Sequence, residues 1–193
     1  GLDQIRFFLF REVPFGNDGD FSKDAIAKRT NADLSNNFGN LIQRICSFIK
    51  KNCNSIIQNS FNLNDDDKNL LKLSDNTLSE YKKYMDNQEI DKALKEIFKL
   101  LTETNIYVDK QSPWVLKNSN KDRMNVVLSI SAEIIRRSTI LLFPVIPESC
   151  EKIFTILNIK KEEINFINFK KIPLNPKKIN EPLPIFPRIE IND

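Results

Sequence analysis

The chain has 193 residues, of which 40% are hydrophobic and 28% charged, with a formal net charge of +3. These proportions suit one domain with a buried core and argue against intrinsic disorder. The charge is too mild to indicate nucleic-acid binding by itself, although one face can still be basic. The absence of histidine excludes catalytic dyads and metal sites built on imidazole.

The three cysteines fit neither a disulfide framework nor the paired spacing of a zinc site, so reduced thiols of a cytoplasmic protein are the simplest account. They are Cys46, Cys53 and Cys150. No apolar run approaches the length of a membrane span, and the first residues do not resemble a signal peptide. Because the chain begins at Gly1 rather than at Met, we expect it to be part of a longer protein.

The first 21 residues predict a short helix and a turn. Residues 2–10 have a helical apolar pattern, and a helix should end before Pro14 because proline disfavours helix at the preceding residue. Residues 17–20 carry two carboxylates, but no third ligand follows at calcium-loop spacing, so we interpret them as a tight turn. This segment, 1–21, is predicted to connect a preceding domain to the helices after residue 21.

Residues 22–158 predict a series of amphipathic helices. Ser22 is a good N-cap, and apolar residues then recur every three to four positions from Asp33 until the pattern fades near Asn52. Two short helices should follow, one capped by Asn64 or Asp65 and the other by Ser74 or Asp75, before a clear stripe over residues 90–108. A break at 112–114 precedes a long helix from Asp122 to Phe143 and a last helix that begins at Pro147.

After Asn158 the composition changes. Five prolines forbid regular helix over residues 159–193, so this tail is predicted to be extended and to pack back on the bundle through its apolar residues. These apolar residues are Phe166, Phe169, Leu183, Ile185 and Phe186. The predicted fold class is therefore all-α, a helix bundle over 22–158 with an extended, proline-rich C-terminal tail over 159–193.

Four stretches of this sequence resemble the methionyl-tRNA synthetases of bacterial type, in the order in which that family carries them. They are REVPFGNDGDFS at 11–22, RTNADL with GNLIQR at 29–34 and 39–44, YVDKQSPW at 107–114, and LPIFPRI at 183–189. The chain departs from the family pattern modestly, with Phe38 before Gly39 and Ser112 before Pro113. The resemblance covers almost the whole chain.

The resemblance implies the anticodon-binding helix bundle of such an enzyme, which recognises the CAU anticodon of initiator and elongator methionine tRNAs. The family's two active-site signatures are missing, so this part alone should be inactive and should need no cofactor of its own. ATP binding and, in many members, a zinc-binding insertion belong to the catalytic domain, with which this part would associate in the intact cytoplasmic protein. The parent would ligate methionine to its tRNA.

The resemblance also implies an anticodon-binding site at Asn40, Arg44, Asp109, Pro113 and Trp114. Trp114 would offer a plane for base stacking, with Pro113 fixing the backbone beside it. Asn40 and Arg44 are four residues apart, so they share one helix face, and their amide and guanidinium suit the mixed donor and acceptor edge of cytosine. Asp109 would orient Arg44.

Each of these residues also has an ordinary structural explanation. Trp114 could be a core tryptophan, Asn40 and Arg44 a polar helix surface, and Asp109 a solvated carboxylate. Arg136, Arg137 and the lysine pairs are candidates for phosphate contacts, or simply solvated charge. A helical protein-interaction scaffold and a free-standing enzyme stay open as alternatives, although the missing catalytic motifs argue against the enzyme.

Overall fold

The computed structural model describes residues 1–13, 21–58, 62–171 and 176–190. The turn predicted at 17–20 lies outside these ranges. The helices of the described residues are α1 (Leu2–Glu12), α2 (Lys23–Arg29), α3 (Asn40–Asn52), α4 (Asp65–Asp86), α5 (Ile90–Gln111), α6 (Pro113–Ser119), α7 (Lys121–Leu142) and α8 (Pro147–Ile156). A π-helical segment (Thr30–Gly39), a 3₁₀ turn (Lys161–Glu163) and two strands, β1 (Ile56–Ile57) and β2 (Lys177–Lys178), complete them. The all-α prediction is confirmed.

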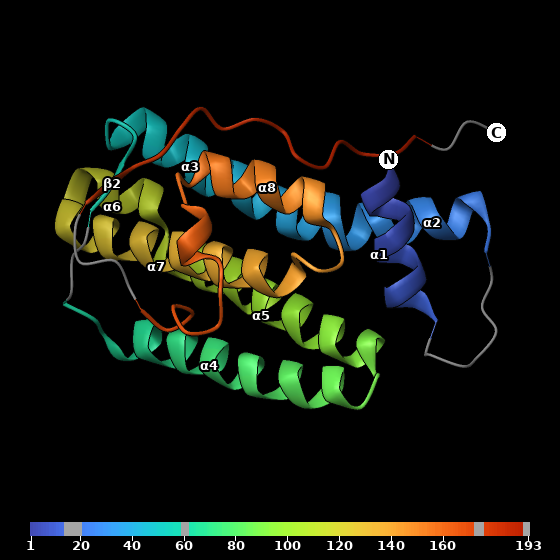
Figure 1. Ribbon diagram of the computed structural model, residues 1–193. Helices are drawn as coiled ribbons and strands as arrows, with labels where there is room; N and C mark the ends of the chain where they lie inside the picture. The colour runs from blue at the N-terminus through green and yellow to red at the C-terminus, as the bar shows by residue number, and fades with distance from the viewer. Residues whose placement is uncertain (14–20, 59–61, 172–175, 191–193) are drawn as a thin grey trace.

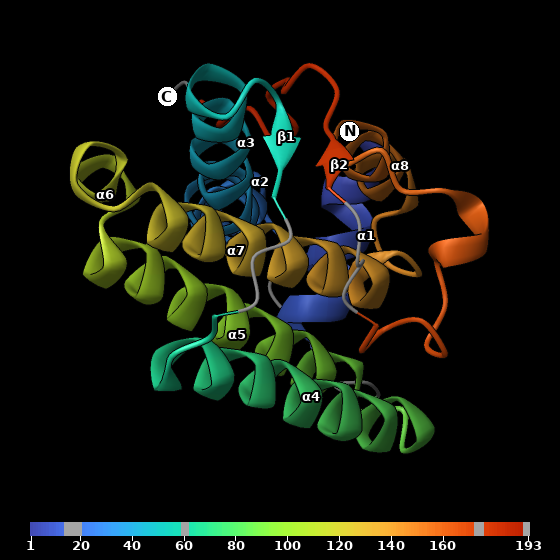
Figure 2. The same cartoon turned by 90° about the vertical axis from the view of Figure 1, so that its left-hand side faces the viewer.

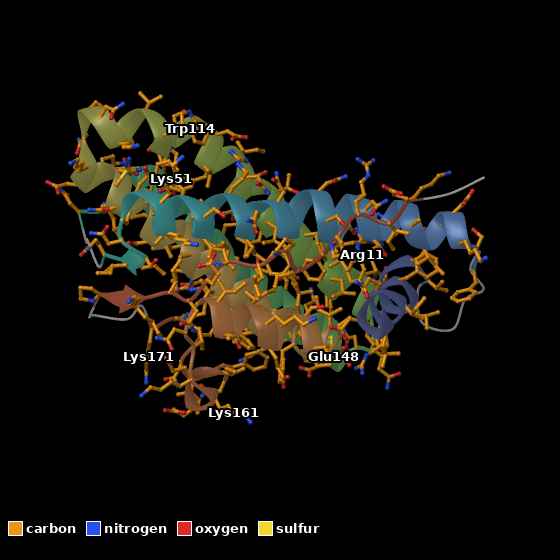
Figure 3. The ribbon with its side chains drawn as sticks, turned by 90° about the horizontal axis from the view of Figure 1, so that it is seen from above. Arg11, Lys51, Trp114, Glu148, Lys161 and Lys171 are labelled. Carbon is orange, nitrogen blue, oxygen red and sulfur yellow. The ribbon has the colours of Figure 1, made fainter. Side chains whose placement is uncertain are left out.

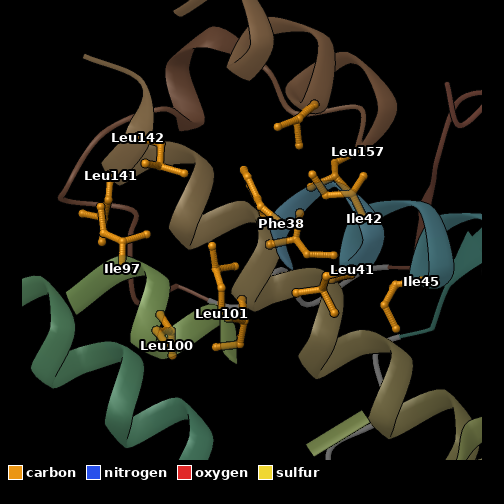
Figure 4. Close-up of a cluster of buried hydrophobic side chains, with 14 of the residues drawn as sticks. Phe38, Leu41, Ile42, Ile45, Ile97, Leu100, Leu101, Leu141, Leu142 and Leu157 are labelled. Atoms are coloured by element: carbon orange, nitrogen blue, oxygen red, sulfur yellow. The ribbon is translucent and has the colours of Figure 1, made fainter. Parts of the chain in front are cut away.

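The helices stack around α7, which is buried over most of its length. Figure 1 shows the α4 and α5 hairpin on one side of α7 and the α3 and α8 helices on the other. A helix that is apolar around most of its circumference must be enclosed in this way. Figure 4 shows the core, where side chains such as Leu41, Leu101 and Leu142 meet from α3, α5 and α7.

The chain is helical without interruption from Lys23 to Asn52. Ser22 caps the start as predicted, because its side chain accepts a hydrogen bond from the Ala25 amide at 3.1 Å. The apolar pattern that begins at Asp33 lies within this continuous helix, since the π-helical segment joins α2 to α3 directly. Gly39 is the last residue of that segment, and only glycine fits there without a shift, because a Cβ would lie 2.9 Å from the Leu34 carbonyl oxygen.

The predicted pair of short helices between Asn64 and Met85 is also wrong. Asn64 does cap the first turn, in a reciprocal capping box with Asp67. However, the helix then continues for 22 residues. Ser74 does not cap a second helix because it is fully buried, and its hydroxyl accepts a hydrogen bond from Arg137 at 3.3 Å. Similarly, Asn120 rather than Asp122 caps α7.

The C-terminal tail follows the surface of the bundle and forms a short strand pair with the segment after α3. Strand β2 is antiparallel to β1, with Ile56 opposite Lys178, and the two lie side by side in Figure 2. Near its end the backbone of Ile189 exchanges two hydrogen bonds with the Asn31 side chain, of 2.9 and 2.8 Å. These two hydrogen bonds hold the end of the tail against the π-helical segment.

The predicted anchors of the tail divide into two groups. Phe169 and Phe186 are buried and Ile185 is half-buried, whereas Phe166 and Leu183 are exposed. Leu183 is 60% exposed and so is not an anchor. Phe166 packs its ring edge against Tyr81 while remaining open to solvent. Ile179, next to β2, is buried although the sequence pattern did not single it out.

Arg136 and Arg137 are not exposed to solvent, whereas arginines that bind tRNA phosphates must be. Both are almost fully buried in α7 and both bind Glu133. Arg136 also donates to the Phe169 carbonyl oxygen at 2.6 Å, and Arg137 to Asp75 at 3.0 Å. These arginines hold the tail and α4 on α7, so they are removed from the candidates for RNA contact.

Candidate nucleic-acid interface

The corner between α5 and α6 projects a tryptophan into solvent. Ser112 adopts a left-handed backbone, with φ of 47°, and its hydroxyl donates to the Asp109 carbonyl oxygen at 2.7 Å. Pro113 follows as the first residue of α6, where its missing N–H costs nothing, and it is buried. Trp114 comes next and is 44% exposed. The corner therefore presents the indole outward from a backbone fixed on both sides.

Arg44 on α3 lies between the indole and a carboxylate. Its Nη2 donates to Asp109 Oδ1 at 2.5 Å, and its Cζ lies 5.6 Å from the centre of the Trp114 ring. Among the described residues, its other guanidinium N–H groups have no hydrogen-bond partner. The arrangement holds three side chains from α3, α5 and α6 together and leaves donors pointing to solvent.

Asn40 lies one turn before Arg44 on the same face of α3 and is exposed. Beside it a groove of about 500 Å³ runs between the long helix and the tail. The groove is lined by Ser35, Asn36, Gly39, Asn40, Gln43, Pro184, Ile185, Phe186 and Arg188. Asn40 thus lies between Arg44 and a groove with both polar and apolar lining residues. Figure 3 shows how Trp114 lies beside α3 at one end of the molecule.

The five residues predicted from the resemblance lie near one another, but they differ in exposure and in what they contact. Asn40, Arg44 and Trp114 reach solvent, Asp109 binds Arg44, and Pro113 is enclosed behind the indole. Such a surface offers an aromatic plane, a guanidinium fork and an amide with both donor and acceptor. These are the groups that read the faces and edges of unpaired bases.

A second set of amides along the same seam was not anticipated from the sequence. Asn105 donates to Asn37 Oδ1 at 2.9 Å, and Asn37 donates to Thr102 at 3.0 Å. They join the π-helical segment to α5, one turn before Asp109. Helical spacing could have indicated Asn105, because it lies four residues before Asp109 and therefore on the same face of the helix.

Residues 57–173 match the family model described as the anticodon binding domain of methionyl tRNA ligase. The chain belongs to that family. Residues 1–46 match a second model, of class I tRNA synthetases of the methionine group. Asn40 and Arg44 therefore lie in the second match, whereas Asp109 and Trp114 lie in the first, and the candidate interface joins the two.

Curated relatives of this anticodon-binding domain carry the name methionine–tRNA ligase. The protein of Brucella suis is 42% identical over 97% of this chain, and that of Rhizobium meliloti is 38% identical over 97%. The chain spans 37% of the length of each of them.

Solved structures of a relative agree with the fold. The free Mycobacterium tuberculosis methionyl-tRNA synthetase superposes with a TM-score of 0.94 at 36% identity, over 100% of this chain and 40% of that one. The same enzyme bound by methionyl-adenylate gives a TM-score of 0.94 at 36% identity, over 97% of this chain and 38% of that one.

The anticodon-binding domain braces its α5 to α6 corner with a buried carboxylate that the sequence pattern did not single out. Asp67 is fully buried, accepts two hydrogen bonds from Arg123 at 2.6 and 2.9 Å, and accepts one from the Tyr107 hydroxyl at 2.5 Å. Arg123 also binds Gln111, next to Ser112, at 2.6 Å. This network joins α4, α5 and α7 behind the exposed indole.

The network also shifts acid–base equilibria. Burial alone would raise the pKa of Asp67, but the bonds from Arg123, Tyr107 and the Asn64 amide outweigh it and hold this pKa below the ordinary 3.8. Burial, followed by the bond to Asp67, raises the pKa of Tyr107. Both groups therefore keep one charge state at neutral pH, as a rigid support requires.

The domain offers no reactive thiol or metal cluster beside Arg44 in the part that the structure describes. Cys46, two residues further along α3, is buried, and burial raises the pKa of its thiol to about 12. In the described ranges, no three cysteine, aspartate or glutamate side chains are grouped so that they could hold a metal ion. Across the same ranges, no helix is both long and apolar enough to cross a bilayer.

Proposed function

We propose that this chain binds the anticodon loop of methionine tRNA and reads the bases CAU. The observation that carries the proposal is the position of Arg44, held between Asp109 at 2.5 Å and the exposed Trp114 ring at 5.6 Å. A guanidinium ordered in this way beside an aromatic plane suits one unpaired base, stacked on the ring and hydrogen-bonded along its edge.

The chemistry favours cytosine at the reading position. Its edge has a carbonyl oxygen and a ring nitrogen that accept hydrogen bonds, and an amine that donates one. Arg44 would donate to the two acceptors, while the Asn40 side-chain carbonyl would accept from the amine. Asp109 would restrict Arg44 rather than touch the RNA, because an anion beside phosphates is repelled.

We further propose that the whole protein is a methionine–tRNA ligase. Supporting this are the family model matched by residues 1–46 and the names of the relatives, of which this chain spans 37%. In that protein, residues 1–21 would link to a catalytic part that binds ATP, methionine and, in many members, zinc. Residues 22–158 would form the reading domain and 159–193 its tail, acting in the cytoplasm on initiator and elongator tRNAs.

A protein-interaction scaffold is the competing function. It would need Trp114 in the core and no polar convergence around it. The 44% exposure of Trp114 and its contact with Arg44 favour RNA instead.

The proposal is tested by binding the chain to short anticodon stem-loops at fixed salt. We expect the CAU loop to bind best, and a loop with a changed first anticodon base to bind more weakly. Asn40→Ala or Arg44→Ala should each remove about 1–3 kcal/mol of this preference, because each deletes a partner of the base edge.

Asn76→Ala is the matched control, since Asn76 is also an asparagine within a helix, on α4, far from Trp114 in the sequence. This variant should keep the full preference. Equal binding of both loops by the unmodified, folded chain would contradict the proposal.

A further inference from the structure

Two long segments of this sequence contain no carboxylate. No aspartate or glutamate occurs in residues 34–64 or in residues 110–121, although Asp and Glu together number 26 in the chain. The first segment contains Arg44, Lys50 and Lys51, and the second contains Lys110, Lys117 and Lys121. We call these two stretches the carboxylate-free segments.

The fold brings the two carboxylate-free segments to the same end of the molecule. The first contains α3 and β1, and the second contains the α5 to α6 corner and α6 itself. Figure 1 shows α6 and the C-terminal end of α3 together at one end, while the turn between α4 and α5 is at the other. That opposite turn carries Asp86, Glu89 and Asp91. Helices α3 and α6 at the Trp114 end therefore carry no carboxylate of their own.

At this end, the exposed lysines of the carboxylate-free segments differ in whether they have a carboxylate partner. Lys50 pairs with Glu181 and Lys110 with Asp66 at 2.9 Å. In contrast, Lys51, Lys117 and Lys121 are exposed and form no ion pair with any residue that the structure describes. Of these three, Lys51 lies on α3 and Lys117 on α6, the helices of Arg44 and Trp114, whereas Lys121 begins α7. Their ammonium groups are free for an external anion.

Helical spacing places Lys51 on the same helix face as Arg44, and Lys117 on the same helix face as Trp114. Lys51 is two turns beyond Arg44 on the same face of α3, about 10 Å along the axis. Asn40, Arg44, Ser47 and Lys51 form one polar row on that helix. On α6, Lys117 is three residues after Trp114, so the two side chains are neighbours. Figure 3 shows Lys51 at the same end of the molecule as Trp114 and on the side opposite Lys161 and Lys171.

We propose that Lys51 and Lys117 bind phosphates of the tRNA backbone next to the bases read at Trp114. This inference rests on the proposed function and assigns two of its backbone contacts. Ammonium groups on flexible stems neutralise phosphates without reading sequence, whereas Arg44 and Asn40 face base edges. The surface thus separates a sequence-independent contact from a sequence-reading one.

The arrangement favours a polynucleotide over an acidic peptide. Helices α3 and α6 each carry one base-binding group, Arg44 or Trp114, and one unpaired lysine, and this combination suits the alternation of base and phosphate in a single strand. A carboxylate-rich peptide would use the cations but would leave the Trp114 face and the Arg44 donors without partners.

The test is the salt dependence of stem-loop binding for Lys51→Gln, Lys117→Gln and the double variant. Each phosphate contact contributes about 0.7–0.9 to the slope of log affinity against log salt concentration. We expect each single variant to reduce the steepness by about that amount, and the double variant by about twice as much. The ratio of affinities for the CAU loop and the changed loop should stay the same.

Lys161→Gln and Lys171→Gln are the matched controls, because both lysines are exposed and lie on the other side of the molecule. They should leave the slope unchanged. The inference is overturned if Lys51→Gln and Lys117→Gln behave like these controls while the unmodified chain prefers CAU. If Lys51→Gln and Lys117→Gln reduce the salt dependence of binding, but the unmodified chain shows no preference for CAU, only the anticodon proposal is contradicted. A folded chain that binds no stem-loop would contradict both.

Discussion

At the scale of single residues, the Arg44 cluster orders a side chain for binding more than it stabilises the fold. The Asp109 side chain is 61% exposed, and ion pairs this open to water contribute about 1 kcal/mol or less. The effect of the pair is to limit the rotamers of Arg44, so that less entropy would be lost on binding the base proposed above. Stability at this corner comes instead from Asp67, which is fully buried.

Replacing Asp67 with asparagine should lower the free energy of unfolding by about 3 kcal/mol at neutral pH. The change leaves Arg123, itself only 16% exposed, without its counter-charge. Denaturant unfolding measures the effect. Asp65→Asn is the control, because that side chain is 96% exposed, and it should cost less than about 0.5 kcal/mol.

The same residue gives the stability a pH dependence with a defined sign. Because the pKa of Asp67 is lower in the folded chain than in the unfolded one, its contribution is complete above about pH 4 and is lost as the pH falls through the folded pKa. The unmodified chain should therefore lose more stability on acidification than Asp67→Asn. Parallel curves would show that the carboxylate is not bound as described.

At the scale of elements, sequence patterns predicted most helices but failed where tertiary contacts decide. The apolar stripes predicted α5, α7 and α8 with ends close to those observed, and the C-terminal end of α3 near Asn52, because amphipathic spacing is a local property. Ser74 was interpreted as a cap because serine favours caps, yet burial against Arg137 overrides that preference. The π-helical join over Thr30–Gly39 has no local signal of this kind.

The tail provides a prediction at the same scale. Phe186 is 6% exposed and lies on Phe38, with ring centres 6.0 Å apart. Phe186→Ala should destabilise the fold by about 3 kcal/mol, because it leaves a cavity between tail and helix. Leu183→Ala, three residues earlier and at a side chain 60% exposed, should cost less than about 0.5 kcal/mol. Thermal melts of both variants make the comparison, and equal melting temperatures would mean that the tail does not pack on the bundle.

At the scale of the whole molecule, the candidate site could be predicted only in part. The resemblance supplied Asn40, Arg44, Asp109, Pro113 and Trp114. Periodicity alone could not have joined them, since they come from three helices. The Asp67 network and the Asn37 and Asn105 amides were not predicted, because contacts between segments far apart in the sequence produce no periodic pattern. The buried Arg136 and Arg137 were misjudged because charge suggests a surface, whereas Glu133 and the tail carbonyls compensate them inside.

The central claim is that Trp114 stacks on an anticodon base beside Arg44, and its own fluorescence tests it most directly. Trp114 is the only tryptophan in the chain, so its emission reports one site. On titration with a CAU stem-loop, we predict quenching and protection from a soluble quencher, both reduced in Arg44→Ala and with a changed first base. Binding of the loop with no change in the emission or accessibility of Trp114 would contradict the account.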